Sequence, residues 1–343
     1  MLNISAVAQE KTAKFSGTWL VTGAAGFIGS NLLHALLSLN QKVIGLDNFA
    51  TGKKENLEDV KSLLDAKLWA NFTFVEGDIR NLEVCKDLCG KADIVLHQAA
   101  LGSVPRSIKN PIDTHQVNVD GFLNMLVSAQ ETKVKRFVYA SSSSVYGDNP
   151  NLPKVESSIG NPLSPYAASK LMNEIYASVF SKVHNFASVG LRYFNVFGPR
   201  QDPNGQYAAV IPRWINAVVQ NEQCTIFGDG KTSRDFCFIE NVVVANILAA
   251  LSDPEKTSGH CPINIGNSDT TSLSDLNQYI RTEVSNQTGK PQSPEPKYED
   301  FRPGDVRHSL ADISKAKDLI EYEPVSNVRE GLGKTVKWFL AKK

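Results

Sequence analysis

The sequence predicts an α/β fold in which a doubly wound parallel sheet is followed by a smaller C-terminal α/β domain. Short apolar runs alternate with helical stretches through the first half of the chain, and this alternation is typical of βαβ units. After Gly198-Pro199-Arg200 the rhythm changes, because Pro, Asn and Gly become frequent and the strand-like runs become short and irregular. In such sheets ligands bind beyond the carboxyl ends of the strands.

Seven apolar runs are the expected strands of the sheet, and an amphipathic stretch through residues 31–37 is the expected helix after the first of them. The last run is expected to return to the sheet from the second half of the chain. Polar residues follow almost every run, so we expect the chemistry to converge on one edge of the sheet. The expected strands are residues 19–22, 42–46, 72–75, 94–96, 137–140, 187–191 and 262–266.

These patterns divide the chain into an extension, a first domain and a smaller capping domain. The N-terminus is polar and lacks the apolar core of a signal peptide. No apolar run approaches the ~18 residues that a membrane span needs. The expected parts are an extension over 1–17, a first domain over 18–198 with 237–268 returning to it, and a second domain over 199–236 and 269–343.

Composition narrows the class of protein. With 343 residues, of which 42% are hydrophobic, the chain can bury a sizeable core. Lys plus Arg equals Asp plus Glu at 36 each, so no charge excess indicates a nucleic-acid partner. Five scattered cysteines do not form a disulfide framework, and although Cys85 and Cys89 can share a helix face, no second pair completes a zinc site. We expect reduced thiols, no metal and a cytoplasmic location.

A glycine motif directly after the first expected strand predicts a dinucleotide site. Gly23 allows a tight turn, Gly26 lets the backbone approach a pyrophosphate, and Gly29 lets the helix pack on the strand. The pyrophosphate would then lie on the positive end of the helix. The alternative is an ordinary glycine-rich turn, but the flanking strand and helix favour a Rossmann-type cofactor site.

Acidic residues at the next two strand ends refine this prediction. Asp47 is placed to accept hydrogen bonds from the adenosine ribose, and its charge would repel a 2′-phosphate, so NAD is favoured over NADP. Lys53 and Lys54 lie close by, and we interpret them as solvated loop charges. Asp78 is expected at the adenine edge, with a helix N-cap as the alternative. Gln98 and the small residues Ala99 and Ala100 follow the fourth strand, where the dinucleotide must pass.

A second signal lies about 140 residues downstream. Tyr166 and Lys170 are four residues apart, so both side chains fall on one helix face, and a serine run from Ser141 to Ser144 precedes them. A free tyrosine is a poor base because its pKa is near ~10. A neighbouring ammonium and a positive nicotinamide ring are expected to lower that pKa. Together with the glycine motif, the pair predicts nicotinamide chemistry on a carbinol.

With these motifs the chain, from Thr18 to its end, resembles the extended short-chain dehydrogenase/reductase family. Within that family it is most similar to the UDP-N-acetylhexosamine 4-epimerases of bacterial polysaccharide biosynthesis. The resemblance implies interconversion of UDP-GlcNAc and UDP-GalNAc through a 4-keto sugar, with tightly bound NAD, in a homodimer. The segments that carry it are TGAAGFIGSNL, HQAALGSVPRS, SSSSVYG, YAASK, LRYFNVFGPRQDPNGQYAAVIP and RPGDVRHS.

The resemblance also assigns roles by position. Tyr166 matches the general base, Lys170 its activator, and Ser142 the hydroxyl that bonds the sugar O4, with Ser143 and Ser144 in the same pocket. Cofactor contacts are implied for Gly23, Gly26, Phe27, Ile28, Gly29, Asp47, Asn48, Phe49, Thr51, Gly52, Asp78, Ile79, Gln98, Ala99, Ala100, Asn118, Tyr166, Lys170, Tyr193 and Val196. Substrate contacts are implied for Ser103, Ser142, Ser143, Ser144, Tyr166, Asn195, Ala209, Val210, Thr225, Ile226, Phe227, Arg234, Arg302, Asp305 and Ser309.

Related activities are separated by single positions. The family's 4,6-dehydratases carry an Asp-Glu pair where this chain has Ser143 and Ser144, and without those carboxylates dehydration lacks its acid and base. A small Ser309, where epimerases of unacetylated hexoses carry tyrosine, leaves room for an N-acetyl group. Two alternatives remain: a UDP-uronic acid 4-epimerase, in which Arg307 would pair with the carboxylate, and a non-catalytic NAD-sensing regulator, which would not need Tyr166 and Lys170.

Overall fold

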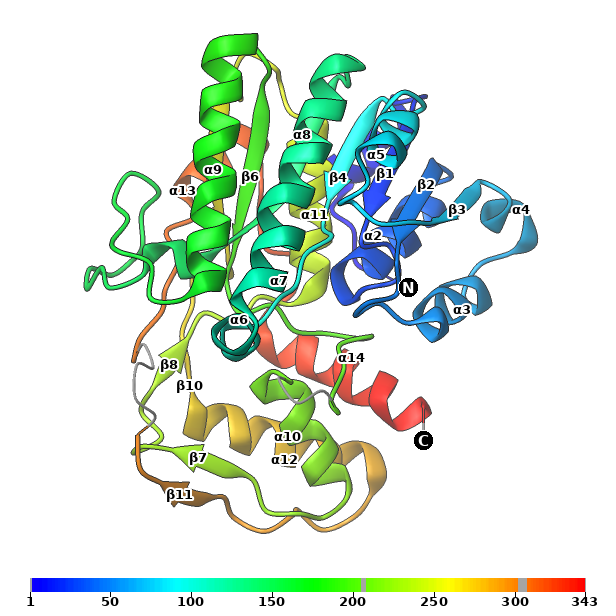
Figure 1. Ribbon diagram of the computed structural model, residues 1–343. Helices are drawn as coiled ribbons and strands as arrows, with labels where there is room; N and C mark the ends of the chain where they lie inside the picture. Colours follow the sequence, from blue (N-terminus) through cyan, green and yellow to red (C-terminus); the bar gives the residue numbers. More distant parts are fainter. Residues whose placement is uncertain (1, 205–207, 302–306, 343) are drawn as a thin grey trace.

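In the computed structural model, which describes residues 2–204, 208–301 and 307–342, a seven-stranded sheet forms the larger part of the molecule (Figure 1). Its strand order is β3-β2-β1-β4-β5-β6-β9, and all neighbouring strands are parallel. Each of the seven expected runs forms a strand, so the predicted fold class is confirmed. The strands are β1 Thr18–Thr22, β2 Lys42–Asp47, β3 Phe72–Glu76, β4 Ile94–His97, β5 Arg136–Ser142, β6 Ser188–Tyr193 and β9 His260–Ile265.

Helices cover both faces of this sheet. On one face α11 packs against α1, α2 and the central strands, and on the other α8 contacts α5 and α9. In Figure 1 α8 and α9 stand in front of β6, with α11 behind them. The helices of this part are α1 Ala6–Ala13, α2 Phe27–Ser38, α3 Lys54–Ser62, α4 Ala66–Trp69, α5 Leu82–Cys89, α6 Val104–Lys109, α7 Pro111–His115, α8 Gly121–Glu131, α9 Pro165–His184, α11 Ile239–Ala250 and α13 Ser314–Ile320, with a π-helix at Gln116–Asp120 and a 3₁₀ helix at Ser143–Tyr146.

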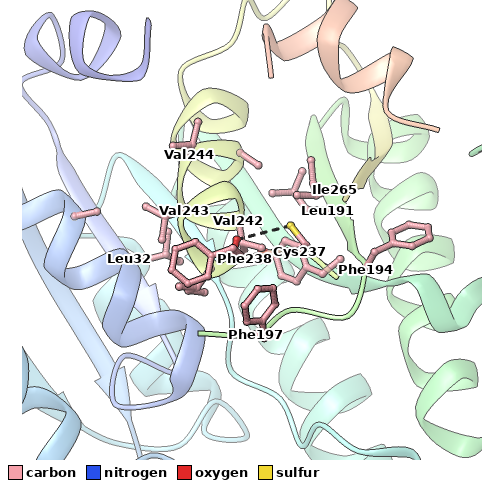
Figure 2. Close-up of a cluster of buried hydrophobic side chains, with 14 of the residues drawn as sticks. Leu32, Leu191, Phe194, Phe197, Cys237, Phe238, Val242, Val243, Val244 and Ile265 are labelled. Carbon is pink, nitrogen blue, oxygen red and sulfur yellow. Dashed lines mark hydrogen bonds between the residues drawn. The ribbon is translucent and has the colours of Figure 1, made fainter. Parts of the chain in front are cut away.

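The central strands are apolar on both faces because both faces are covered. Successive side chains of a strand point to opposite faces, so Trp19 and Val21 join the core under α2 and α11 while Leu20 joins the core under α5 and α8. Figure 2 shows part of the first core, in which Leu32 of α2 and Val243 of α11 lie close together. Double coverage explains why the strands read as continuous apolar runs.

A smaller unit lies below the large sheet in Figure 1, with α14 between the two. Two two-stranded sheets, β8 with β10 and β7 with β11, form its outer part, and α12 and α14 pack together beside α10. One segment differs from the expected division, because α13 packs on β9 and α11 and thus on the large sheet. The elements of this unit are α10 Val210–Val219, β7 Thr225–Phe227, β8 Ser233–Arg234, β10 Thr271–Ser272, α12 Leu273–Thr288, β11 Lys297–Glu299 and α14 Val328–Ala341.

The segment before the first strand is not a bare extension but carries α1. Ser5 caps this helix by accepting a hydrogen bond from the Ala8 backbone N–H at 3.3 Å. Ala8 and Thr12 are fully buried, and α1 contacts α11. Across the described residues, none of the helices has the length and apolar character needed to cross a bilayer.

Candidate active site

A cavity of about 570 Å³ lies at the carboxyl ends of the parallel strands. It brings together sixteen of the predicted cofactor residues, whereas Phe49, Gly52, Asn118 and Val196 do not line it. Arg80, Leu101, Asp113 and Val117 also line it, and no sequence motif indicated them. The predicted residues in its wall are Gly23, Gly26, Phe27, Ile28, Gly29, Asp47, Asn48, Thr51, Asp78, Ile79, Gln98, Ala99, Ala100, Tyr166, Lys170 and Tyr193.

The glycine turn fits a pyrophosphate because it has no room for side chains. Gly23 has φ +70°, and a Cβ there would lie 2.9 Å from the backbone nitrogen of Ala99. A Cβ on Gly29 would overlap the carbonyl oxygen of Gly23. Gly26 is the N-cap of α2 and provides no side chain, so the first N–H groups of the helix face the cavity. This cradle fits the diphosphate of NAD.

Asp47 shapes the loop that closes one side of the cavity. Its carboxylate accepts hydrogen bonds from the backbone N–H groups of Ala25 at 2.9 Å and Phe49 at 2.8 Å. Burial raises the pKa of Asp47, and these backbone donors offset part of that shift. A Cβ on Gly52 would lie 2.8 Å from both carboxylate oxygens. Phe49 therefore holds the Asp47 carboxylate through its backbone N–H, and Gly52 packs closely against the same carboxylate. Neither residue lines the cavity.

The two lysines that follow this loop carry exposed charges that also contact the protein. Lys53 Nζ lies 2.9 Å from the carboxylate of Asp202, at the start of the segment that enters the smaller unit. Lys54 Nζ lies over the Phe49 ring, 5.2 Å from its centroid. Both lysines are exposed, as the expectation of solvated charges requires, and each also contacts a neighbouring side chain.

Asp78 belongs to a charged cluster at the far end of the cavity. Its carboxylate accepts hydrogen bonds from Arg80 Nη2 at 2.7 Å and from Asn48 Nδ2 at 2.8 Å. The bond from Arg80 is the main reason that the pKa of Asp78 falls to about 2. The helix that follows is capped by Asn81, whose side chain accepts from the Glu83 N–H. The N-cap interpretation of Asp78 was therefore wrong.

Tyr166 and Lys170 lie on the first turns of α9, at the centre of the cavity wall. Ser164 caps this helix through its bond from the Ala167 N–H, with proline at the first helical position. Lys170 Nζ donates to the carbonyl oxygen of Ala140 at 2.8 Å and lies 5.9 Å from the centroid of the Tyr166 ring. Strand β5 therefore fixes the ammonium one turn away from the phenol.

Burial within the protein shifts the pKa values of both Tyr166 and Lys170. Desolvation lowers the pKa of Lys170 to about 8. Desolvation also raises the pKa of Tyr166, and the neighbouring Ser142 hydroxyl lowers it only in part. The expected lowering of the Tyr166 pKa is therefore not achieved by the protein groups, since burial is a tertiary effect that a motif does not reveal.

The serine run ends β5 and turns directly into the 3₁₀ helix. Ser142 accepts hydrogen bonds from the Ser144 backbone N–H at 3.2 Å and from the Ser144 hydroxyl at 2.8 Å. Ser143 begins the 3₁₀ helix and is half-buried. Ser141 lines the cavity and donates to Glu174 of α9 at 2.6 Å. The Ser141 hydroxyl is thus bonded to α9, whereas the hydroxyls of Ser142 and Ser144 are bonded to each other and do not line the cavity.

Two predicted cofactor residues use their polar atoms to shape the wall. Asn118, in the π-helix, accepts from the Leu101 N–H at 2.7 Å and donates to Leu101 O at 3.1 Å. The Tyr193 hydroxyl donates to Gln98 at 3.0 Å and accepts from the Asn246 side chain at 2.8 Å. Asn246 is fully buried on α11, so only the tertiary fold connects it with the site.

A second, smaller cavity of about 130 Å³ lies in the smaller unit. It contains five predicted substrate residues together with four that the sequence did not indicate. The Nε1 of Trp214 is buried there without a hydrogen-bond partner among the described residues. The lining residues are Asn195, Val210, Arg213, Trp214, Thr225, Phe227, Arg234, Phe236 and Leu273.

Three further predicted substrate residues have structural positions near these cavities. Ser103 is the N-cap of α6, has φ +108° and accepts from the Arg106 N–H at 3.3 Å. Ile226 is fully buried in β7, between the two lining residues of that strand. Ala209 is the N-cap of α10, directly before Val210.

Ser309 lies beside the strand that carries Arg234. Its backbone N–H donates to Ser233 O at 3.1 Å, and its carbonyl accepts from the Asp235 N–H at 2.8 Å. It is half-buried. Arg302 and Asp305, which the resemblance also assigns to the substrate, lie outside the described residues.

Comparison with known proteins agrees with this geometry. A relative from Methanocaldococcus jannaschii described as a putative UDP-glucose 4-epimerase is 35% identical over 321 residues, with 93% of this chain and 97% of the relative covered. The solved UDP-N-acetylglucosamine 4-epimerase of Methanobrevibacter ruminantium, in complex with UDP-N-acetylmuramic acid, is 38% identical with a TM-score of 0.85, covering 96% of this chain and 99% of that one.

A second solved structure contains the expected cofactor. The UDP-glucuronic acid 4-epimerase of Bacillus cereus, in complex with UDP-glucuronic acid and NAD, is 32% identical with a TM-score of 0.82, covering 95% of this chain and all of that one. The family model described as "NAD dependent epimerase/dehydratase family" matches residues 19–266. This chain therefore belongs to the NAD dependent epimerase/dehydratase family and is an NAD-dependent enzyme.

Proposed function

We propose that this enzyme is a UDP-sugar 4-epimerase that interconverts UDP-GlcNAc and UDP-GalNAc, as the resemblance to the epimerases of polysaccharide biosynthesis implies. The observation that carries the proposal is the pairing of two cavities. One has the dinucleotide cradle with Tyr166 and Lys170 in its wall, and the other combines Arg234 and Asn195 with apolar side chains. An arginine beside apolar walls suits a nucleoside diphosphate.

The residues divide the work of the reaction between them. In our proposal Tyr166 takes the proton from the sugar O4 and returns it after the 4-keto sugar has turned over. Ser142 bonds the same oxygen and keeps it close to the phenol. Lys170, fixed to Ala140 O, stabilises the phenolate. When bound, NAD supplies the reversible oxidation at C4.

The size of one side chain favours an acetylated sugar. Ser309 is held by backbone bonds beside the strand of Arg234. The family resemblance places a tyrosine at this position in epimerases of unacetylated hexoses, and we propose that the smaller serine accommodates the N-acetyl group. A uronic acid would require a cation at the sugar, and Arg307 was the candidate. The Arg307 guanidinium stacks on Phe301, 4.1 Å from the ring centroid. We therefore favour the acetylated substrate over the uronate.

The two cavities also suggest which part of the chain binds which ligand. We assign NAD to residues 18–198 with 237–268, and the UDP-sugar to 199–236 with 269–343 except α13, which packs on the large sheet. The cytoplasm is the compartment that we propose, because all five cysteines are free thiols.

We also propose that the enzyme is a homodimer joined through α9. Ile175, Val179 and Val183 are exposed apolar residues four positions apart, and exposed Ile112 lies on α7, which contacts α9. A second copy of the same face would cover them. Sedimentation of Val179→Glu should show monomers, whereas Val7→Glu, at an exposed site on α1, should sediment like the wild type. A wild-type monomer would contradict the proposal.

The substrate assignment is tested by direct turnover. The purified holoenzyme is incubated separately with UDP-GlcNAc, UDP-Glc and UDP-glucuronic acid, and the 4-epimers are separated by chromatography. We expect UDP-GlcNAc to be converted at least as fast as UDP-Glc and faster than the uronate. Preferential turnover of the uronate would replace the proposal by its alternative. Absence of turnover on all three, with NAD still bound, would favour the NAD-sensing regulator.

A further inference from the structure

The helix that carries Tyr166 and Lys170 also carries a buried ion pair. Glu174 Oε2 lies 2.7 Å from Arg192 Nη2, and Arg192 Nε donates to Glu174 Oε1 at 2.9 Å. Both side chains are more than nine-tenths buried, with 6% and 3% exposed. Desolvation offsets much of the attraction in such a pair, so stability alone is a weak reason for it. Its geometry suggests another role.

The pair joins α9 to the ends of β5 and β6. Ser141 Oγ donates to Glu174 Oε1 at 2.6 Å. Ser141 also lies opposite Arg192 in the parallel ladder between the two strands. The carboxylate of the helix is therefore bonded at once to a side chain from each strand, directly before Ser142.

A second bond reinforces this connection one turn earlier on the helix. Lys170 and Glu174 are four residues apart and lie on the same face of α9. Lys170 donates to Ala140 O at 2.8 Å, while Glu174 accepts from Ser141. Consecutive turns of the catalytic helix are thus bonded to consecutive residues of β5.

The guanidinium of the pair is itself fixed from the far side. Arg192 Nη1 donates to the Tyr146 hydroxyl at 3.0 Å and to Glu156 O at 3.1 Å. The Tyr146 hydroxyl donates in turn to Asn264 of β9 at 2.6 Å. Because Arg192 cannot follow a displaced helix without breaking these bonds, it acts as a fixed point for Glu174.

We propose that Glu174 is a positioning residue for the epimerase reaction, one that holds α9 so that Tyr166 and Lys170 keep their places beside Ser142. It touches none of the reacting atoms. A displacement of about 1 Å at a reacting group can cost on the order of 100-fold in rate. A small shift of α9 would therefore be enough to lower kcat measurably. The inference rests on the proposed 4-epimerase function but not on which UDP-sugar is used.

Three variants separate positioning from simple stabilisation. Ser141→Ala removes the bond between Glu174 and β5 and leaves both the ion pair and the bond from Lys170 to Ala140 O. Because Ser141 also lines the cofactor cavity, bound NAD is measured for this variant. Glu174→Asp keeps the charge but shortens the side chain by one methylene, and Glu174→Gln keeps the length but leaves the Arg192 charge uncompensated. Ser188→Ala is the matched control, because Ser188 is buried on the same strand as Arg192 and its hydroxyl has no hydrogen-bond partner among the described residues.

The measurements are kcat, KM, bound NAD and Tm, with the UDP-sugar that the wild type converts fastest. We expect Ser141→Ala to lower kcat about 10- to 100-fold while KM, NAD content and Tm stay near wild type. Glu174→Asp should lower kcat by a similar factor and also lower Tm, because the shorter side chain loses contact with the buried Arg192. Glu174→Gln should lower Tm as well, and Ser188→Ala should change nothing. The proposal would be overturned if Ser141→Ala and Glu174→Asp kept the kcat of the wild type. It would also be overturned if their kcat fell only in proportion to the loss of folded protein. A wild type inactive on every UDP-sugar would overturn the proposed function and this inference with it.

Discussion

Substitution of Gly29 by alanine is the sharpest test of the cofactor cradle. The added Cβ would overlap the carbonyl oxygen of Gly23 and would lie 2.7 Å from its carbonyl carbon and 3.0 Å from the Cα of Ala24. All three contacts are with backbone atoms, so no side-chain rotation relieves them. Helix α2 would have to move away from the end of β1, and its N-terminal N–H groups would move with it.

The size of the effect follows from the cost of such a shift. Backbone displacement in a packed region costs about 1–3 kcal/mol. If that cost falls on the cofactor site, NAD binds about 5- to 150-fold more weakly, since about 1.4 kcal/mol is tenfold. Two matched variants scale the effect. Gly26→Ala places its Cβ 3.1 Å from Gly23 O, so it strains the protein less and acts on NAD mainly by filling the space of the pyrophosphate. Gly102→Ala, in the same cavity wall, meets no protein heavy atom within 4 Å and should cost least.

The assay measures NAD retained per protein after gel filtration, together with the dissociation constant of NAD from titration of stripped protein. Near-wild-type far-UV circular dichroism would show that each variant is folded. We expect Gly102→Ala to retain the most NAD, and both Gly26→Ala and Gly29→Ala to retain less. If Gly29→Ala retains NAD as tightly as Gly102→Ala, the turn is not the pyrophosphate cradle.

Four further outcomes are expected. Denatured protein should release NAD(H), and recovery of mainly NADP(H) would contradict the role of Asp47. Tyr166→Phe should keep NAD but lower turnover about 10²- to 10⁴-fold, and near-normal turnover would place the base elsewhere. Because burial lowers the pKa of Lys170 to about 8, the ammonium bonded to Ala140 O loses its charge as pH rises through that value, so kcat should fall on the alkaline side; a flat profile there would contradict it. Ser309→Tyr should selectively remove turnover of acetylated UDP-sugars, and an unchanged ratio of acetylated to plain turnover would refute the pocket assignment.

Local patterns were sufficient for the fold and for most of the cofactor cavity. The apolar runs became strands because a sheet covered on both faces requires continuous apolar sequence. Gly23, Gly26 and Gly29 were identifiable because the turn needs them at fixed spacing. Such a motif spans only a short stretch of sequence, and the strand before it and the helix after it can be predicted from the neighbouring residues.

The features of the site that could not be predicted depend on contacts between segments that are distant in the sequence. Asn246 lies on α11 yet bonds Tyr193 in the cavity wall, and no spacing rule connects the two. The raised pKa of Tyr166 comes from burial, which only the packed structure reveals. Trp214 has the apolar spacing of an ordinary core residue in α10, so nothing local marked it as part of the second cavity.

In the proposed reaction, the separation of the two cavities lets one site present both faces of a sugar to one cofactor. The proposed reacting groups, Tyr166 and Lys170, belong to the large sheet, whereas Thr225 and Arg234 belong to the smaller unit. If the nucleotide is held in the second cavity, its binding energy does not depend on the orientation of the sugar. The 4-keto sugar can then turn over without losing its anchor, and interactions at the reacting centre remain available for the transition states of both half-reactions. A rigid catalytic helix and a freely rotating sugar are therefore complementary requirements, and the bonds from α9 to β5 meet the first of them.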